Sequence, residues 1–296
     1  MASCEEQVSF VRYGTSAPFE DGRLPVIVSK SVEGLESMNV TGLYDGWDPN
    51  QYNRFAAERE QPFWDLRGLL RDVDEPVVVD LGCGDGRLTA PLAVSLGAAS
   101  TEGLDSSPAM IGVAKERETD RLRFNLADIS DWCRPATYDV VFANASMQWV
   151  PDHRSVLAKW KASLRERGQI CVQVPANADH PSHQLAGSVA REFMDVAPLD
   201  PVAQNVLSPE EYSALLHHEG FVEQNVRLQV YSHSLASVGE LVEWVKGTTL
   251  TRFKEPLGPE RWEQFVQRYR ERLTHELGDC SPCFYPFKRI LMWAQR

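Results

Sequence analysis

The sequence lacks the features that carry a chain into a membrane or out of the cell. No apolar run approaches the roughly 18 residues needed to cross a bilayer. The N-terminal stretch MASCEEQVSF has neither the basic region nor the apolar core of a secretory signal peptide. The six cysteines are scattered, and the pair Cys280 and Cys283 has no second pair to complete a zinc site. We therefore expect a cytoplasmic protein with reduced thiols and no metal.

Positive charge is also scarce. Lys and Arg number 30 against 42 Asp and Glu, which gives a formal net charge of −12. Binding to nucleic acid or to an anionic membrane surface depends on clustered basic residues. Solubility is the more usual consequence of net acidity. We expect a small-molecule partner, no nucleic acid and no membrane, in a chain that is a monomer or a homodimer.

The chain divides into an arm and one domain. Residues 1–46 show no sustained periodicity, and residues 47–296 carry the regular patterns. From residue 77 to residue 175, short apolar strands alternate with helices, which predicts an α/β fold with a parallel sheet covered on both faces. Residues 176–207 and 236–258 interrupt this alternation, as cap insertions would.

Local signals give the helix ends. Spacing of aromatic and small residues places Tyr52 and Arg59 on one face of a helix that begins at Asp48, and we expect Pro62 to end that helix. Further along, we expect a helix that stops before Gly168 and a last helix that starts near Pro259.

The stretch VVVDLGCGDGRL, residues 77–88, is a strand followed by a glycine-rich turn. Its glycines are Gly82, Gly84 and Gly86. A dinucleotide signature places the third glycine five residues after the first, whereas here it comes at four. Asp80 and Asp85 in the same turn would repel a pyrophosphate, by about 1 kcal/mol per pair even where solvent is present. S-adenosylmethionine has no phosphate and carries two cationic groups, so the turn favours that nucleoside.

Polar residues follow the next strands at their carboxyl ends, where ligands bind in open α/β sheets. Asp105, with Ser106 beside it, is placed to accept the ribose hydroxyls. Asp128 is placed to accept from an adenine amino group, with Ile129 against the ring. Asn144 ends the fourth strand, where the reactive end of the cofactor is expected.

With these residues, the chain resembles class I S-adenosylmethionine-dependent methyltransferases and, more narrowly, the trans-aconitate 2-methyltransferase family. The stretches that carry the resemblance are WDPNQYNRFAAER, VVDLGCGDG, GLDSSPAMI, FANASMQWVPDH and FKRILMWAQR. The resemblance implies a Rossmann-like sheet, mostly parallel with an antiparallel last strand, with helical cap insertions around 176–207 and 236–258. It also implies methyl ester formation on a small (poly)carboxylic acid such as trans-aconitate.

A carboxylate acceptor has a pKa of about 4, so it is ionised at neutral pH and needs no general base. It does need desolvation, alignment and cations. The acceptor-site candidates are Tyr52, Arg59, Gln148, Trp149, His183, Arg252 and Arg289. The resemblance suggests that Arg59 also contacts the carboxylate of the cofactor. Thr249 stands where the family tends to have a glycine, which affects the cap in which the acceptor is selected.

Three alternatives stay open at the sequence level. A methyltransferase acting on a hydroxyl, thiol or amine of another small metabolite would usually want a base, for which His153 or His183 is available. A silent S-adenosylmethionine-binding subunit and a dehydrogenase are the other two. Two or more cations facing into the cap would favour a polycarboxylate acceptor.

Overall fold

The structure is a computed structural model, and it describes residues 56–296. It begins in helix α2 (Ala56–Arg67). The predicted arm, Tyr52 and the helix start at Asp48 lie outside the described residues, as does the side chain of Arg59. Within this range, no helix combines the length and the apolarity that crossing a membrane would require.

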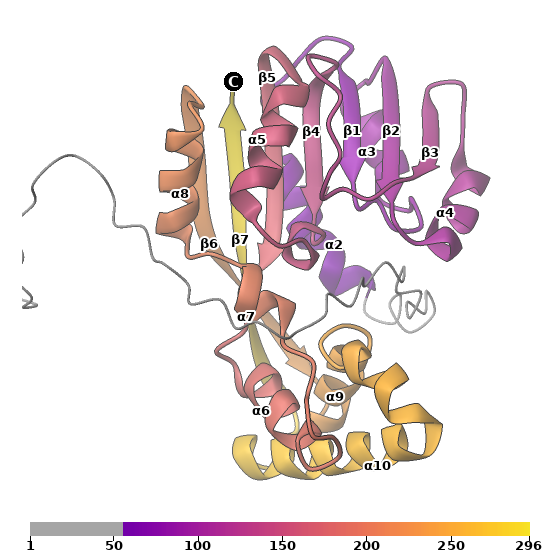
Figure 1. Cartoon of the computed structure of the whole chain (residues 1–296), viewed down its shortest axis with the longest axis vertical. Helices are drawn as coiled ribbons and strands as arrows, with labels where there is room; N and C mark the ends of the chain where they lie inside the picture. Colours follow the sequence, from indigo (N-terminus) through magenta and orange to yellow (C-terminus); the bar gives the residue numbers. More distant parts are fainter. Residues whose placement is uncertain (1–55) are drawn as a thin grey trace, which may run out of the picture. The chain divides into compact units, whose positions relative to one another are not determined.

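A seven-stranded sheet forms the body, in the order β3-β2-β1-β4-β5-β7-β6 (Figure 1). The strands are β1 (Val77–Leu81), β2 (Ser100–Asp105), β3 (Leu122–Leu126), β4 (Tyr138–Asn144), β5 (Leu164–Pro175), β6 (Glu223–Leu235) and β7 (Cys283–Gln295). Strands β1 to β5 pair in parallel, and β7 runs antiparallel to both of its neighbours. The predicted fold class, mostly parallel with an antiparallel last strand, is confirmed.

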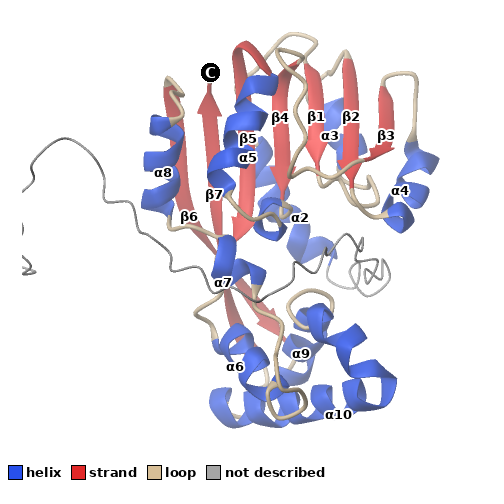
Figure 2. Cartoon of the chain, viewed as in Figure 1, coloured by secondary structure: helices blue, strands red, loops and turns tan. Residues whose placement is uncertain are grey.

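Helices connect these strands and cover the sheet. They are α3 (Thr89–Ser95), α4 (Pro108–Ala114), α5 (His153–Ser163), α6 (Pro181–Ala190), α7 (Pro201–Asn205), α8 (Pro209–His218), α9 (Val238–Lys246) and α10 (Thr251–Leu277). Two short 3-10 turns, Lys115–Arg117 and Met147–Trp149, complete the set. Figure 2 shows α5 and α8 on one face of the sheet and α2 and α3 on the other.

Strand alternation explains why both faces are buried, because successive side chains point to opposite sides. On β1, Val78 packs in one cluster with Phe63 and Leu66 of α2. The next residue, Val79, packs in a second cluster with Trp160 of α5 and Tyr212 of α8. The same alternation recurs on β4 and β5, so the continuous apolar runs read from the sequence are strands covered on both sides.

The cap, formed by α6, α9 and α10, is connected to the sheet by two long strands. Strands β6 and β7 pair from Glu223 and Gln295 to Leu235 and Cys283, whereas β5 accompanies β7 only as far as Pro175. The remaining two-stranded ribbon contributes side chains to a third apolar cluster with α6, α9 and α10. The lower part of Figure 1 shows these helices gathered around the ribbon.

One predicted helix end was wrong. Pro62 lies inside α2, where burial of Phe63 and Leu66 outweighs the helix-breaking preference of proline. The helix predicted to stop before Gly168 is confirmed, since α5 ends at Ser163, where Leu164 already pairs with β4. Helix α10 has a break at Gly258, whose φ is +68°, so its second segment begins near Pro259, as predicted.

The cap core supplies a stability test. Phe265 is fully buried and packs against Phe253 and Trp262, so we expect Phe265→Ala to lower the free energy of unfolding by about 3–5 kcal/mol. Phe284, which is 63% exposed, is the control, and Phe284→Ala should change the free energy by less than about 0.5 kcal/mol. Urea denaturation measures both, and equal losses would contradict the packing described here.

Candidate functional site

The site lies where the strand order reverses, between β1 and β4. Ligands of open α/β sheets bind outside the carboxyl ends of the strands at such a reversal. The glycine turn leaves β1 at this point, and Asn144 ends β4 beside it. Ser146, just after β4, donates a hydrogen bond from Oγ to the carbonyl of Leu81, with a distance of 2.6 Å. The two strand ends are therefore fixed to each other.

The three glycines of the turn have different surroundings, although all have positive φ. A Cβ on Gly82 would lie 2.2 Å from the Cβ of Ser146, and one on Gly86 would lie 2.5 Å from the ring of Phe124. A Cβ on Gly84 would meet no atom of the described residues within 4 Å. Gly82 and Gly86 are thus required by packing, while Gly84 borders open space that a ligand can fill.

Asp105 holds the turn in this shape. Its Oδ2 accepts a hydrogen bond from the amide of Gly84 at 2.9 Å, and its Oδ1 accepts one from the amide of Ser107 at 2.9 Å. Burial raises the pKa of Asp105, and these backbone hydrogen bonds oppose the rise. Ser106 lies between these contacts and is exposed.

Asp80 is buried beneath the turn. Its Oδ2 accepts a hydrogen bond from the hydroxyl of Thr89, the first residue of α3, at 2.6 Å. Burial raises the pKa of Asp80 to about 7, helped by the charge of Asp105 and opposed by the hydrogen bond from Thr89. This carboxylate ties the end of β1 to α3, so any effect on a ligand is exerted through its charge and through the turn.

The two residues predicted at the adenine end are placed differently from each other. Asp128 is exposed, and its Oδ1 accepts a hydrogen bond from the amide of Ser130 at 2.8 Å. Ile129 belongs to the core cluster that contains Trp160, and its side chain is buried. Ile129 is therefore positioned as a core residue rather than as an open wall for a ring.

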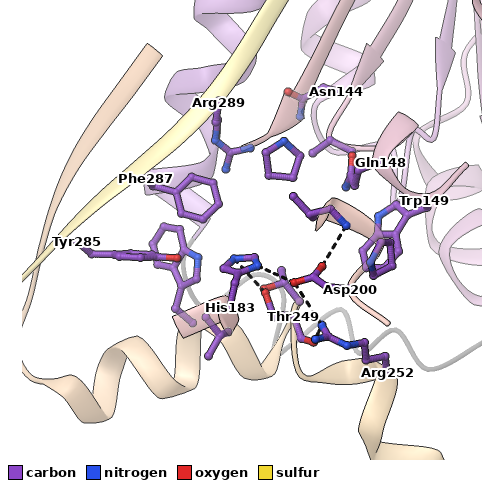
Figure 3. Close-up of a pocket in the computed structure, with 17 residues that line it drawn as sticks. Asn144, Gln148, Trp149, His183, Asp200, Thr249, Arg252, Tyr285, Phe287 and Arg289 are labelled. Carbon is purple, nitrogen blue, oxygen red and sulfur yellow. Dashed lines mark hydrogen bonds and ion pairs between the residues drawn. The ribbon is translucent and has the colours of Figure 1, made fainter. Parts of the chain in front are cut away.

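A pocket with about 810 Å³ of empty space, its open mouth included, lies between the carboxyl ends of the strands and the cap (Figure 3). Five of the acceptor-site candidates line it, together with Asn144. These five are Gln148, Trp149, His183, Arg252 and Arg289. They come from the turn after β4, from α6, from α10 and from β7, so the fold brings together residues that are distant in the sequence.

Arg289 enters the pocket from β7. It is 6% exposed, and its Nη1 donates a hydrogen bond to Oε1 of Gln173 on β5 at 3.1 Å. Its guanidinium also lies over the ring of Phe287, 4.7 Å from the centroid. Gln173 and Phe287 thus hold a buried positive charge at the edge of the pocket.

The opposite wall carries a second group of polar residues (Figure 3). His183 Nδ1 lies 3.1 Å from Oδ2 of Asp200, and His183 Nε2 lies 3.3 Å from Oγ1 of Thr249. Arg252 donates to the carbonyl of Thr249 and lies 3.8 Å from Asp200. The sequence did not identify Asp200 as a site residue. Its one local signal, a helix cap before Pro201, says nothing about the pocket.

Two side-chain amides at the strand end have unsatisfied oxygens. Oδ1 of Asn144 and Oε1 of Gln148 are buried and have no hydrogen-bond partner among the described residues. Gln148 is held by its Nε2, which donates to the carbonyl of Ala145 at 2.7 Å. Buried polar atoms in native proteins normally have partners, so these oxygens are suited to donors on a ligand.

His153, the weak catalytic candidate, lies outside this group. It is 3% exposed and is not among the residues that line the pocket. Its Nε2 faces the carbonyl of Met147 and its Nδ1 faces the hydroxyl of Tyr212, both at 2.8 Å. Both ring nitrogens are therefore used within the fold, and the structure does not support His153 as a base.

Comparisons with known proteins agree with this geometry. Residues 78–168 match a family described as "Methyltransferase domain". A trans-aconitate 2-methyltransferase from Deinococcus radiodurans is 37% identical over 256 residues, covering 84% of this chain and 98% of that protein. A protein of the same name from Rhodococcus jostii is 37% identical over 259 residues, covering 84% of this chain and 99% of that protein.

Two solved structures share the fold. The YcgJ protein from Bacillus subtilis has a TM-score of 0.56 at 15% identity, covering 80% of this chain and 98% of that chain. Phosphoethanolamine N-methyltransferase 2 from Haemonchus contortus, solved with S-adenosyl-L-methionine, has a TM-score of 0.54 at 15% identity. That match covers 83% of this chain and 56% of the other. At these identities the likeness concerns the fold alone.

Asp80 makes the stability of the protein depend on pH. Its pKa is raised from 3.8 to about 7 on folding, so the native state holds the proton more tightly than the unfolded chain. Stability is therefore highest below the unfolded pKa and falls as pH rises toward the folded pKa. Relative to Asp80→Asn, we expect the wild type to lose about 2 kcal/mol between about pH 5 and about pH 7. Urea denaturation at both pH values measures this, and parallel profiles would contradict it.

The turn glycines supply a second test. Gly84→Ala should fold, at a cost of about 1–2 kcal/mol for its positive φ, and should weaken S-adenosylmethionine binding roughly tenfold or more by filling the open space. Gly86→Ala is the matched control, because its new Cβ meets Phe124 and should mainly lower the melting temperature. Calorimetry and thermal melts separate the two. Unchanged binding by Gly84→Ala would show that the ligand lies elsewhere.

Proposed function

We propose, on the premise that this chain belongs to the trans-aconitate 2-methyltransferase family, that it methylates a small carboxylic acid. The methyl group would come from S-adenosylmethionine, and the product would be a methyl ester of a (poly)carboxylic acid such as trans-aconitate. The observation that carries the proposal is Arg289, a buried guanidinium in the wall of a pocket that adjoins the end of β4. A guanidinium in the wall of a ligand pocket presents planar donors that match the geometry of a carboxylate.

The residues of the turn fit S-adenosylmethionine. No side chain of the turn occupies the space beside Gly84, so a group of the ligand can enter it. The buried Oδ1 of Asn144 suits a hydrogen-bond donor such as an ammonium. Asp105 places negative charge beside this space, which favours a cation and disfavours a diphosphate. Asp80, whose pKa is raised to about 7, adds to this charge as the pH rises above that value. Asp128 and Ser106 are retained as further cofactor contacts. Arg59 and Tyr52 stay predictions from the sequence.

S-adenosylmethionine, when bound, supplies a methyl group activated by a sulfonium. The chain itself has to bind the acceptor, align one carboxylate oxygen and keep water out. We assign the binding of that carboxylate to Arg289, whose guanidinium lines the pocket. Gln148 lines the same pocket, and its buried Oε1 would accept a hydrogen bond from a donor group on a ligand. Trp149, Trp244 and Phe287 surround the acceptor with apolar surface, which strengthens the attraction between Arg289 and the carboxylate.

A hydroxyl, thiol or amine acceptor is the alternative, and it would usually want a base. Among the residues that line the pocket, His183 is the candidate. Its two ring nitrogens face Asp200 and Thr249, which leaves neither nitrogen directed at an acceptor. A carboxylate acceptor needs no base and therefore suits this pocket better.

We also retain the expectation of a monomer or homodimer in the cytoplasm that acts on a small molecule. The net charge of −12 supports the absence of a nucleic-acid partner.

Arg289 provides the direct test of the acceptor site. Arg289→Gln should lower kcat/KM for carboxylic acid acceptors by roughly a hundredfold or more, because a buried charge partner is lost. The dissociation constant of S-adenosylmethionine should change less than about twofold, since Arg289 is assigned to the acceptor alone. Transfer of radiolabelled methyl to a panel of di- and tricarboxylic acids measures the first quantity, and calorimetry measures the second.

Lys288→Gln is the matched control. Lys288 is the neighbour of Arg289 on β7, and its Nζ pairs with Asp179, whose side chain is 67% exposed. This variant should keep wild-type kinetics. Similar losses in both variants, or transfer to hydroxyl compounds but to no acid, would overturn the proposed function.

A further inference from the structure

Strand β5 carries two buried glutamines that occupy equivalent positions in the sheet. Gln169 and Gln173 are each at most 1% exposed, and because they lie four residues apart, their side chains share one face of the strand. Each accepts a hydrogen bond from the side chain of a β7 residue that lies two positions before the one opposite it. Trp293 donates to Gln169 at 2.7 Å, and Arg289 donates to Gln173 at 3.1 Å.

The amide of Gln169 is fully hydrogen-bonded within the fold. Its Oε1 also accepts a hydrogen bond from the backbone amide of Arg71 at 2.9 Å, and its Nε2 donates to the carbonyl of Arg71 at 3.0 Å. Neither Arg71 nor Trp293 is among the residues that line the pocket. Gln169 therefore has a structural role, which is to join the segment after α2 to β5 and β7.

The amide of Gln173 is only half used. Its Oε1 has to be the atom that faces Arg289, because a guanidinium only donates hydrogen bonds, and this fixes the orientation of the amide. Its Nε2 is buried and has no hydrogen-bond partner within the part of the chain that the structure describes. A buried donor without a partner destabilises the folded state, whereas an apolar side chain of similar length would not. Packing alone does not explain a glutamine at this position.

The neighbours of Gln173 belong to the pocket. Asn144 is its partner on β4, Pro175 is the next residue on the same face of β5, and Arg289 lies on β7, and all three line the pocket. Figure 3 shows Asn144 and Arg289 at the same end of the pocket. Gln173 does not line the pocket itself, so its effect on a ligand is exerted through the residue to which it is hydrogen-bonded, Arg289.

We propose that Gln173 is a positioning residue that holds the guanidinium of Arg289 in the orientation that binds the acceptor carboxylate. This inference rests on the proposed function, since it concerns the binding of the acceptor at the same site. An amide suits this task, because its oxygen orients the guanidinium without adding a negative charge that would repel the acceptor. The unpaired Nε2 is then the consequence of an amide that the site requires and the fold does not.

Gln173→Met tests this role, because methionine has a similar length and lacks the amide. For the acid that the wild type methylates best, with trans-aconitate tested first, we expect KM to rise about tenfold and kcat to fall less than about threefold. The dissociation constant of S-adenosylmethionine should change less than about twofold. The melting temperature should change by less than about 3 °C, because removal of the unpaired donor offsets the lost hydrogen bond.

Gln169→Met is the matched control, since it is the same substitution at the equivalent position of the strand. It removes three hydrogen bonds, so the melting temperature should fall by about 5–10 °C. KM for the acceptor should stay within about twofold of the wild-type value. If Gln173 had only a structural role, both variants would lose melting temperature and keep the wild-type KM, and this result would overturn the inference.

Gln173→Glu supplies the same test if the methionine variant does not fold. It keeps an oxygen for Arg289 but adds a negative charge that opposes an anionic acceptor, so KM should rise by about a hundredfold. An unchanged KM in a folded variant, or weaker binding of S-adenosylmethionine in place of the acceptor, overturns the inference and leaves the proposed function standing. Methyl transfer by the wild type to none of the acids would instead refute the proposed function.

Discussion

A separation of charge organises the site of this protein. Carboxylates gather around the turn after β1, where Asp80 is buried beneath it and Asp105 binds the amide of Gly84. The buried guanidinium of Arg289 lies at the end of β5, where Arg289 pairs with Pro175 and donates a hydrogen bond to Gln173. Methyl transfer between a cationic donor and an anionic acceptor needs this arrangement, because each reactant then meets the opposite charge. The reversal of strand order between β1 and β4 puts the two charged regions at one edge of the sheet.

The two-stranded ribbon of β6 and β7 makes the acceptor half possible. Because β7 pairs with β5 and then continues past it, one strand carries both Arg289, beside the sheet, and Tyr285, in the cap core. The cap is therefore built on the same strand that positions the cation. Asp200 then connects α6, α7 and α10 around the pocket. We therefore expect a change in the cap that moves these helices to alter the choice of acceptor more than it alters the turn after β1.

Local patterns in the sequence predicted the sheet well, because buried parallel strands are continuous apolar runs and their carboxyl ends carry the polar residues. The antiparallel last strand came from the family resemblance. The same patterns failed at Pro62, where burial of the neighbouring Phe63 sustains the helix. This outcome depends on tertiary contacts, which a local signal does not contain.

In the candidate site, too, the sequence predicted some residues and could not predict others. Asp105 was predicted at the right strand end, whereas Ile129 was predicted as a wall for a ring and is packed into the core. Asp200 was not predicted as a site residue, because the residues that it contacts in the pocket lie in other segments of the chain and form no sequence motif with it. His183 and Arg252 were chosen as cations for the acceptor, and their common link to an acid becomes visible only in three dimensions.

The most direct measurement is calorimetric titration of the purified chain with S-adenosylmethionine, S-adenosylhomocysteine and NAD at low and high salt. Our account predicts that S-adenosylmethionine binds, that the homocysteine compound without the sulfonium charge responds less to salt, and that NAD does not bind. Tight binding of NAD with no binding of S-adenosylmethionine would contradict the view that the acidic glycine turn is built for a cationic methyl donor.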